Sequence, residues 1–166
     1  MVLALALFGA GRAGAQVPTT DEKATKTAEV TTLVNSGSYT FAAAKLTNGK
    51  NSSQDLPTGY VMDISKDTLV AHLPGYKRTN PQAVQDSTLT CTKFTYQKST
   101  QKNGDWLVTI RPSGVNVGDF GPVRELKLDI MPTGYATLTV SGNKPVSCYG
   151  YIKQHSAEFP AVSPAQ

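Results

Sequence analysis

Apolar and polar residues alternate with a period of two through much of this chain. The clearest stretch is ELKLDI at residues 125–130, in which Leu126, Leu128 and Ile130 alternate with charged residues. Successive side chains of an extended strand point to opposite faces of a sheet, so this pattern predicts a strand with one buried and one solvated face. A chain built from such strands has to fold around a sheet.

Other segments share this alternation or have the composition of strands. We expect strands at residues 39–47, 60–64, 68–73, 89–97, 106–110, 125–130, 135–140 and 146–152. The Asn103-Gly104 pair before residue 106 indicates a hairpin turn. Three segments are predicted to be connections: a polar loop at 51–58, an exposed loop at 74–86, whose two prolines oppose a central strand, and a Gly-rich connection at 112–122.

Residues 21–35 are predicted to form a helix, with Asp21 as its N-cap and Gly37 as its stop signal. The helix is short and only moderately amphipathic, so we expect it to be stabilised mainly by packing on the sheet. No strand–helix–strand alternation follows it. We therefore expect an α+β fold, mainly antiparallel β, with the N-terminal helix packed on a curled sheet of about eight strands. A sandwich and a partly closed barrel both fit this pattern.

The N-terminal residues have the form of an export signal. Residues 1–15 are a short apolar stretch that ends in Ala13-Gly14-Ala15, and we predict a signal peptide cleaved near Ala15. The stretch is well short of the ~20 residues that a membrane-spanning helix needs. We expect a leader at residues 16–20, a single β-rich domain at 21–154 and a flexible tail at 155–166. The predicted location is periplasmic or secreted.

Two cysteines, Cys91 and Cys148, lie in predicted strands. In an oxidising compartment they could form a disulfide, and closing so long a loop would add on the order of 4 kcal/mol of stability. The alternative is that both are buried free thiols that act as small apolar side chains. Their spacing excludes a Cys-x-x-Cys redox motif or a zinc knuckle.

The charge distribution argues against a nucleic-acid partner. There are 16 basic and 12 acidic residues, a formal charge of +4, and the basic ones are scattered singly or in pairs. Binding to nucleic acid needs Lys and Arg gathered on one face. We predict solubility from this charge and no nucleic-acid partner.

No pattern in the sequence indicates catalysis, a metal site or a cofactor. The chain has only two histidines, His72 and His155, and neither accompanies a recognisable nucleophile and carboxylate. Metal sites need several converging ligands, and the aspartates are dispersed near strand ends and turns. We therefore predict no catalytic residues, no metal and no cofactor.

The predicted loop at 74–86 contains an aromatic residue and two cations, Tyr76, Lys77 and Arg78. Loops held by a rigid scaffold often carry function, so these three residues are a candidate site for an anionic or sugar-like ligand. A simple solvated loop is the alternative, since charged runs usually face water.

Several strand motifs resemble a known family. They are TLVAHLP at 68–74, WLVTI at 106–110, LKLDI at 126–130, GYATLTV at 134–140 and SCYGYI at 147–152. Over about residues 25–153 the chain resembles the exported proteins grouped as domain of unknown function 4251. It departs from their pattern at Gly75, at Lys77 and at its cysteines. The resemblance implies a β-rich fold and an envelope location, and it implies no activity.

These observations predict an uncharacterised exported protein that acts as a non-enzymatic binding or interaction module of the cell envelope. Its partner would be an unknown ligand or envelope protein, and the protein would be a monomer or weak dimer. One alternative is a periplasmic hydrolase that uses scattered carboxylates. Another is a structural subunit that pairs through an exposed sheet edge.

Overall fold

The computed structural model describes residues 20–47, 53–76, 84–117, 121–142 and 145–155. The predicted signal peptide and its cleavage point lie outside these residues, as do Lys77 and Arg78 and all of the predicted tail except His155. These remain predictions. No helix in the described ranges has both the length and the apolar character that crossing a membrane requires.

The described residues form one helix and twelve strands. They are α1 (Thr20–Ser36), β1 (Tyr39–Thr47), β2 (Ser53–Asp55), β3 (Val61–Ile64), β4 (Leu69–Tyr76), β5 (Val84–Cys91), β6 (Phe94–Thr100), β7 (Trp106–Pro112), β8 (Asn116–Val117), β9 (Gly121–Pro122), β10 (Glu125–Ile130), β11 (Tyr135–Ser141) and β12 (Val146–Gln154). Ten strands form one sheet in the order β5-β4-β3-β1-β12-β11-β10-β7-β6, with β2 paired to β1, while β8 and β9 form a separate pair. The main sheet is antiparallel throughout, as predicted.

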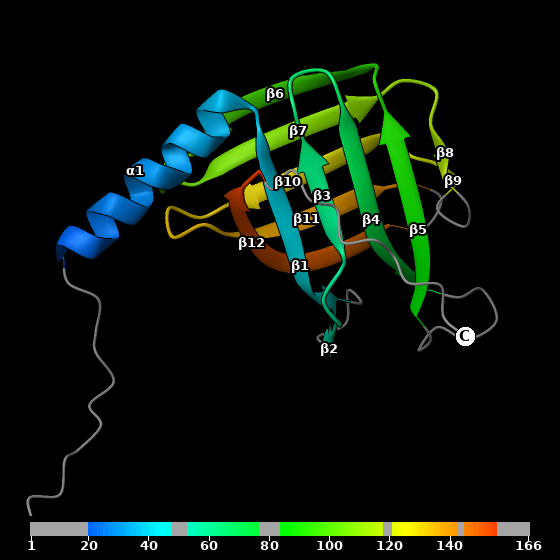
Figure 1. Cartoon of the computed structure of the whole chain (residues 1–166), viewed down its shortest axis with the longest axis horizontal. Coiled ribbons are helices and arrows are strands. Elements are labelled where there is room, and N and C mark those ends of the chain that lie inside the picture. Colours follow the sequence, from blue (N-terminus) through cyan, green and yellow to red (C-terminus); the bar gives the residue numbers. More distant parts are fainter. Residues whose placement is uncertain (1–19, 48–52, 77–83, 118–120, 143–144, 156–166) are drawn as a thin grey trace, which may run out of the picture.

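The two edges of this sheet are consecutive in the sequence. Strands β5 and β6 occupy opposite ends of the strand order, yet only Thr92 and Lys93 separate them. The sheet must therefore curl until its two edge strands meet at one corner, and Figure 1 shows the resulting half-barrel. Of the two arrangements that the sequence left open, the structure is the curled, partly closed one.

One face of the sheet and the end of the helix form a single hydrophobic core. Leu126, Leu128 and Ile130 are fully buried, as the alternation predicted. The buried positions of neighbouring strands, such as Phe41 and Leu138, join them. Burying this face provides the main driving force for folding. We call the opposite face of the sheet the outer face.

Helix α1 packs on the sheet with its C-terminal half only. Val30 and Val34 are buried, and the Tyr96 hydroxyl donates to the Val34 carbonyl at 3.1 Å. Residues 21–29 are all exposed, and Figure 1 shows this half of the helix extending away from the sheet. The helix ends at Ser36, and Gly37, the predicted stop signal, follows it with a φ of 64°, a conformation that glycine adopts without strain.

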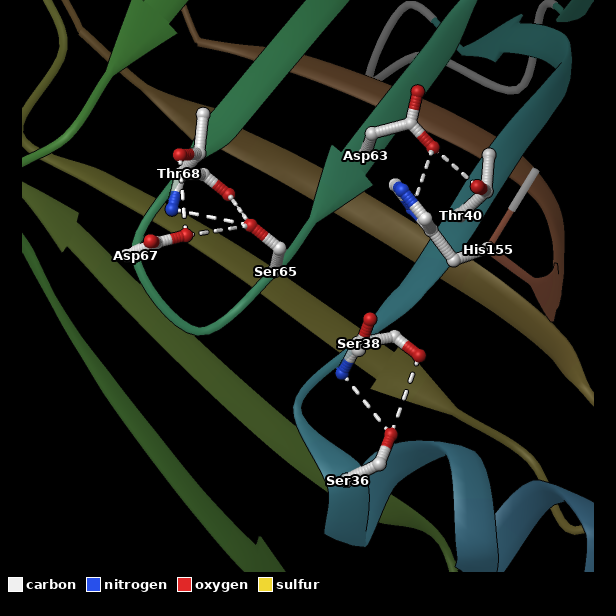
Figure 2. Close-up of polar contacts among 8 residues, drawn as sticks. All are labelled: Ser36, Ser38, Thr40, Asp63, Ser65, Asp67, Thr68 and His155. Carbon is white, nitrogen blue, oxygen red and sulfur yellow. Dashed lines mark hydrogen bonds and ion pairs between the residues drawn. The ribbon is translucent and has the colours of Figure 1, made fainter. Parts of the chain in front are cut away.

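The predicted hairpin turn is confirmed, and a second turn joins β3 to β4. The chain reverses between β6 and β7 around Asn103-Gly104, where the Gln101 amide donates to the Asp105 carbonyl at 2.7 Å. Between β3 and β4, the Ser65 hydroxyl donates to the Thr68 carbonyl at 2.9 Å and closes the turn (Figure 2).

The predicted single strand at 89–97 is wrong, because it spans the corner where the sheet edges meet. The chain ends β5 at Cys91, bends, and begins β6 at Phe94. The Lys93 carbonyl at this corner accepts from the Ser113 amide at 2.8 Å and from the Cys91 thiol at 3.0 Å. Continuous strand composition therefore conceals a change of position from one edge of the sheet to the other.

The predicted loop at 74–86 is too long at both ends. Strand β4 continues through Pro74 to Tyr76, and these residues pair with the first residues of β5. The pairing of β4 with β3 ends at His72, so beyond that point β4 has a partner on one side only. A proline, which lacks an N–H, is tolerated where a strand is hydrogen-bonded to a neighbour on one side only.

The other two predicted connections contain short strands. Strand β2 lies within 51–58 and pairs with Lys45 to Thr47, because β3 pairs with β1 only as far as Ala42 and leaves the rest of that edge free. The segment 112–122 contains β8 and β9, which pair with each other.

Both cysteines are buried, and both are free thiols. Cys91 lies on the edge strand β5 and Cys148 on the central strand β12, with β4, β3 and β1 between them in the strand order. The structure therefore corresponds to the second of the two alternatives, the pair of buried thiols, and does not contain the disulfide.

Candidate ligand-binding groove on the outer face

A groove of about 320 Å³ lies on the outer face over β1, β3 and β12. Its floor is low because Ala42 and Ala44 of β1 carry small side chains, and the pairing of β1 with β12 is irregular between Ala43 and Lys45. The segment 56–60 forms a wall, held to β1 by bonds from the Leu56 amide to the Ala44 carbonyl and from the Ala43 amide to the Tyr60 carbonyl, both 2.9 Å. Small side chains beside a raised segment create the hollow.

A buried carboxylate lines this groove. Asp63 is only 6% exposed, and Thr40, its register partner across β1 and β3, is 2% exposed. The Thr40 hydroxyl donates to Oδ1 of Asp63, and Nδ1 of His155 lies 3.5 Å from the same oxygen. Figure 2 shows Thr40 and His155 converging on Asp63. A buried carboxylate needs such partners, because desolvation penalises an unpaired charge.

A negatively charged hydrogen-bond acceptor and a positively charged donor both line this groove. Oδ2 of Asp63 has no hydrogen-bond partner among the described residues, so it can accept a donor from a bound molecule. Lys153, the register partner of Thr40 on β12, also lines the groove and supplies a cationic donor. The site therefore offers both an acceptor and a donor.

Aromatic side chains border the groove on its β12 side. Tyr151 lines the groove and is 45% exposed. Tyr135, 50% exposed, is its register partner on β11, and the Tyr135 ring stacks on Tyr149 with centroids 5.8 Å apart and an interplanar angle of 12°. We call Tyr151, Tyr135 and Tyr149 the tyrosine row.

A second polar cluster adjoins the opposite side of the groove. The hydroxyl of Tyr60 donates to Oδ1 of Asp86, and its ring stacks on His72 at 5.3 Å. Nδ1 of His72 lies 3.4 Å from the Thr88 hydroxyl oxygen, and Nε2 lies 3.8 Å from Oδ2 of Asp86. Burial, followed by the hydrogen bond to Asp86 and its charge, raises the pKa of Tyr60 to about 12. The Tyr60 hydroxyl therefore stays neutral at physiological pH, and its hydrogen bond to Asp86 and ring contact with His72 hold this wall of the groove in place.

Neither cluster has the geometry of a nucleophilic site, in which a histidine lies between hydroxyl and carboxylate. At Asp63, the threonine and the histidine both approach one carboxylate oxygen. The Thr40 hydroxyl therefore donates its hydrogen bond to Asp63 rather than to His155. His72 does lie between a hydroxyl, that of Thr88, and a carboxylate, that of Asp86. Both contacts are long, however, and Thr88 and Asp86 are exposed. Within the described ranges, no three His, Cys, Asp or Glu residues gather to hold a metal ion.

Of the three predicted ligand-binding residues, only Tyr76 lies within the described residues. Tyr76 ends β4 and pairs with Val84, while Lys77 and Arg78 fall outside the described residues. The groove uses other residues, drawn from β1, β3, β12 and the segment before β3. One signal for it was present in the sequence: Asp63 interrupts the apolar stretch VMDI at 61–64.

Comparison with known proteins identifies a family and a fold. The family model of a domain of unknown function, DUF4251, matches residues 21–152. The chain is also similar to the crystal structure of a DUF4251 family protein from Bacteroides eggerthii DSM 20697, with a TM-score of 0.65 and 11% identity over 79% of this chain and 89% of that one. At this identity the likeness shows the fold alone. No curated protein matches the chain.

Proposed function

This chain belongs to the DUF4251 family of domains of unknown function, and because membership brings no activity, we propose from the groove that the protein is a non-enzymatic binding module of the cell envelope. The ligand occupies the groove over β1, β3 and β12.

The observation that carries this proposal is the buried carboxylate in a hollow on a face that is otherwise not part of the core. A strand position that faces outward is normally solvated, whereas Asp63 is 6% exposed. A volume of about 320 Å³ lies at the low end of the range for small-molecule sites, and such sites combine apolar walls with a few fixed polar groups. The groove has both, with Leu56, Pro57 and Val61 as apolar contributors.

The arrangement of polar groups supports binding rather than turnover. Catalysis by acid and base needs two groups that reach the same reacting atoms from a suitable distance. Here the Thr40 hydroxyl donates to Oδ1 of Asp63, and the His155 imidazole approaches the same oxygen to 3.5 Å. Such a network holds a carboxylate in position, which suits a hydrogen-bond acceptor.

The envelope location in this proposal comes from the N-terminal sequence. Residues 1–15 have the apolar core and the small residues of a cleaved export signal. We expect the exported chain to begin at Gln16, ahead of α1.

Native mass spectrometry of the full-length protein, expressed for export and recovered from the periplasm, tests this proposal. We expect a chain that starts at Gln16 and carries an additional non-covalent mass, which disappears under denaturing conditions. In an Ala42→Trp variant, whose indole fills the groove, the additional mass should be lost. Thr109→Trp, on the outer face of β7 and away from the groove, is the matched control and should keep it.

Three results would contradict the proposal. An additional mass that survives Ala42→Trp would place the ligand elsewhere. Turnover of peptides, esters or glycosides that disappears in Asp63→Asn would show that the groove is an active site. An unprocessed chain would overturn the location separately from the binding.

A further inference from the structure

We infer that the ligand of the groove is a neutral glycan, with one sugar ring in the groove beside Asp63 and the adjoining rings on the tyrosine row. This inference rests on the proposed function, and it adds the chemical class of the ligand and a second part of the site.

The charges that line the groove favour a neutral ligand with many hydroxyl groups. A cation drawn to Asp63 would also meet Lys153, and an anion drawn to Lys153 would meet Asp63. A sugar hydroxyl both donates and accepts, so neighbouring hydroxyls can donate to Oδ2 of Asp63 and accept from Lys153 at the same time. Hydrogen bonds to charged groups are the stronger kind, so both contacts would contribute to affinity.

The tyrosine row supplies the flat surface that sugar rings require. The face of an aromatic ring carries partial negative charge, and the C–H groups on one side of a pyranose ring carry partial positive charge. Tyr151 and Tyr135 present exposed rings and are cross-strand neighbours. Stacking of Tyr135 on Tyr149 restrains the Tyr135 ring, which lowers the entropy lost when a sugar binds.

The position of the row indicates a chain of sugars. Tyr151 lines the groove, and Tyr135 lies beside it on the next strand, farther from Asp63. Facing side chains of paired strands have Cβ atoms about 5 Å apart. A ligand that fills the groove and contacts both tyrosines must therefore extend beyond one ring.

The composition of this surface argues against a protein partner. Within the described ranges, the exposed large apolar side chains are Met131, Tyr135 and Tyr151. A protein interface buries about 800 Å² on each partner around an apolar core. Two tyrosines that carry hydroxyl groups, beside a groove of about 320 Å³ that contains a carboxylate and an ammonium group, fit a smaller and more polar ligand.

A glycan array that carries neutral and acidic oligosaccharides, probed with the exported protein, is the first test. We expect binding to neutral oligosaccharides. The best oligosaccharide is then titrated by calorimetry against Tyr151→Ala, Tyr151→Phe and the unchanged protein. Because a stacking contact needs the ring and not its hydroxyl, Tyr151→Ala should raise the Kd about tenfold or more, while Tyr151→Phe should stay within about twofold.

The Tyr135→Ala variant tests whether the ligand is a chain of sugars or a single sugar ring. It should weaken binding of a tetrasaccharide and leave binding of the corresponding monosaccharide unchanged. Circular dichroism and thermal unfolding of each variant confirm that a loss of binding is not a loss of fold.

Several outcomes would overturn the inference. Absence of binding across the array, with the non-covalent mass still present and still removed by Ala42→Trp, would reject the glycan and leave the proposed function intact. A preference for acidic oligosaccharides would reject the neutral class. Equal affinity of Tyr151→Ala and the unchanged protein would show that the tyrosine row does not bind the sugar rings. Absence of both array binding and any groove-dependent mass would reject the proposed function with the inference.

Discussion

Gly150 on β12 lies so close to the backbone of Ala42 on β1 that a Cβ atom at position 150 would overlap the Ala42 carbonyl oxygen. The same atom would meet the Ala43 Cα at 3.0 Å. The contact is with backbone, which cannot rotate away as a side chain can. Ala42 also lines the groove, so Gly150 sets the separation of two strands that form the candidate site.

Gly150→Ala should destabilise the protein by at least about 2 kcal/mol, because β1 would have to move away from β12. Urea unfolding followed by circular dichroism measures this change. Gly37→Ala is the matched control, since a Cβ atom there would have no neighbour within 4 Å and only the φ of 64° opposes alanine. That strain costs about 1–2 kcal/mol. A Gly150→Ala protein as stable as the original would show that the strands are less tightly placed.

Thr40→Val should destabilise the protein by about 1–3 kcal/mol, because it removes the hydroxyl that donates to the buried Asp63 carboxylate. Valine keeps the shape of threonine, so packing is nearly unchanged. Thr109→Val, at a half-buried outer-face position of β7, should change stability by less than about 0.5 kcal/mol. Equal effects of the two substitutions in urea unfolding would contradict the role assigned to the Thr40 hydroxyl.

Both cysteines should resist alkylation in the folded protein. They are buried, and burial raises the pKa of the Cys148 thiol to about 12, so it holds its proton at neutral pH. The thiolate is the reactive form. Iodoacetamide should give no adduct on the native protein and two after unfolding in urea without a reductant, as counted by mass spectrometry. An unfolded, unreduced chain that takes up no iodoacetamide would show a disulfide and contradict the free thiols.

Stability should fall at alkaline pH. Burial raises the pKa of Tyr39 well above 10.0, and burial with the Asp86 contact raises the pKa of Tyr60 to about 12. The unfolded chain releases these protons near pH 10, while the folded chain retains them, so the unfolded state binds fewer protons there. The free energy of unfolding should be constant with respect to these groups below about pH 9 and should decrease between about pH 10 and 12.

Urea unfolding at a series of pH values measures this decrease, with tyrosinate absorbance to follow ionisation. Tyr60→Phe removes one of the groups whose pKa is raised and should make the decrease shallower. A free energy of unfolding that does not change across this range would contradict the burial of these hydroxyls.

The candidate site was much less predictable than the fold. The sequence pointed to Tyr76, Lys77 and Arg78 because an aromatic and two cations are adjacent there. The groove joins Thr40 and Asp63, which are 23 positions apart, and His155, which follows the last strand, approaches Asp63 to 3.5 Å. Adjacency in sequence is a poor guide to such a site, because antiparallel pairing brings together residues from distant strands.

Local elements followed from the sequence without any knowledge of the tertiary structure. The alternation at 125–130 was sufficient to predict both a strand and its buried residues, and Asn103-Gly104 and Gly37 were sufficient to predict a hairpin and a helix end. Each of these depends on side-chain periodicity or on backbone conformation within a few residues. That is the range over which sequence patterns act.

The order of the strands, the closure of the sheet and the groove emerge only when the whole chain folds. The segment 89–97 has continuous strand composition, yet it divides between the two edges of the sheet. Which strands become neighbours depends on the free energy of packing the whole core, and their register then determines which outer-face residues meet. Thr40, Asp63 and Lys153 become neighbours through pairings of β1 with β3 and β12 that no local pattern encodes.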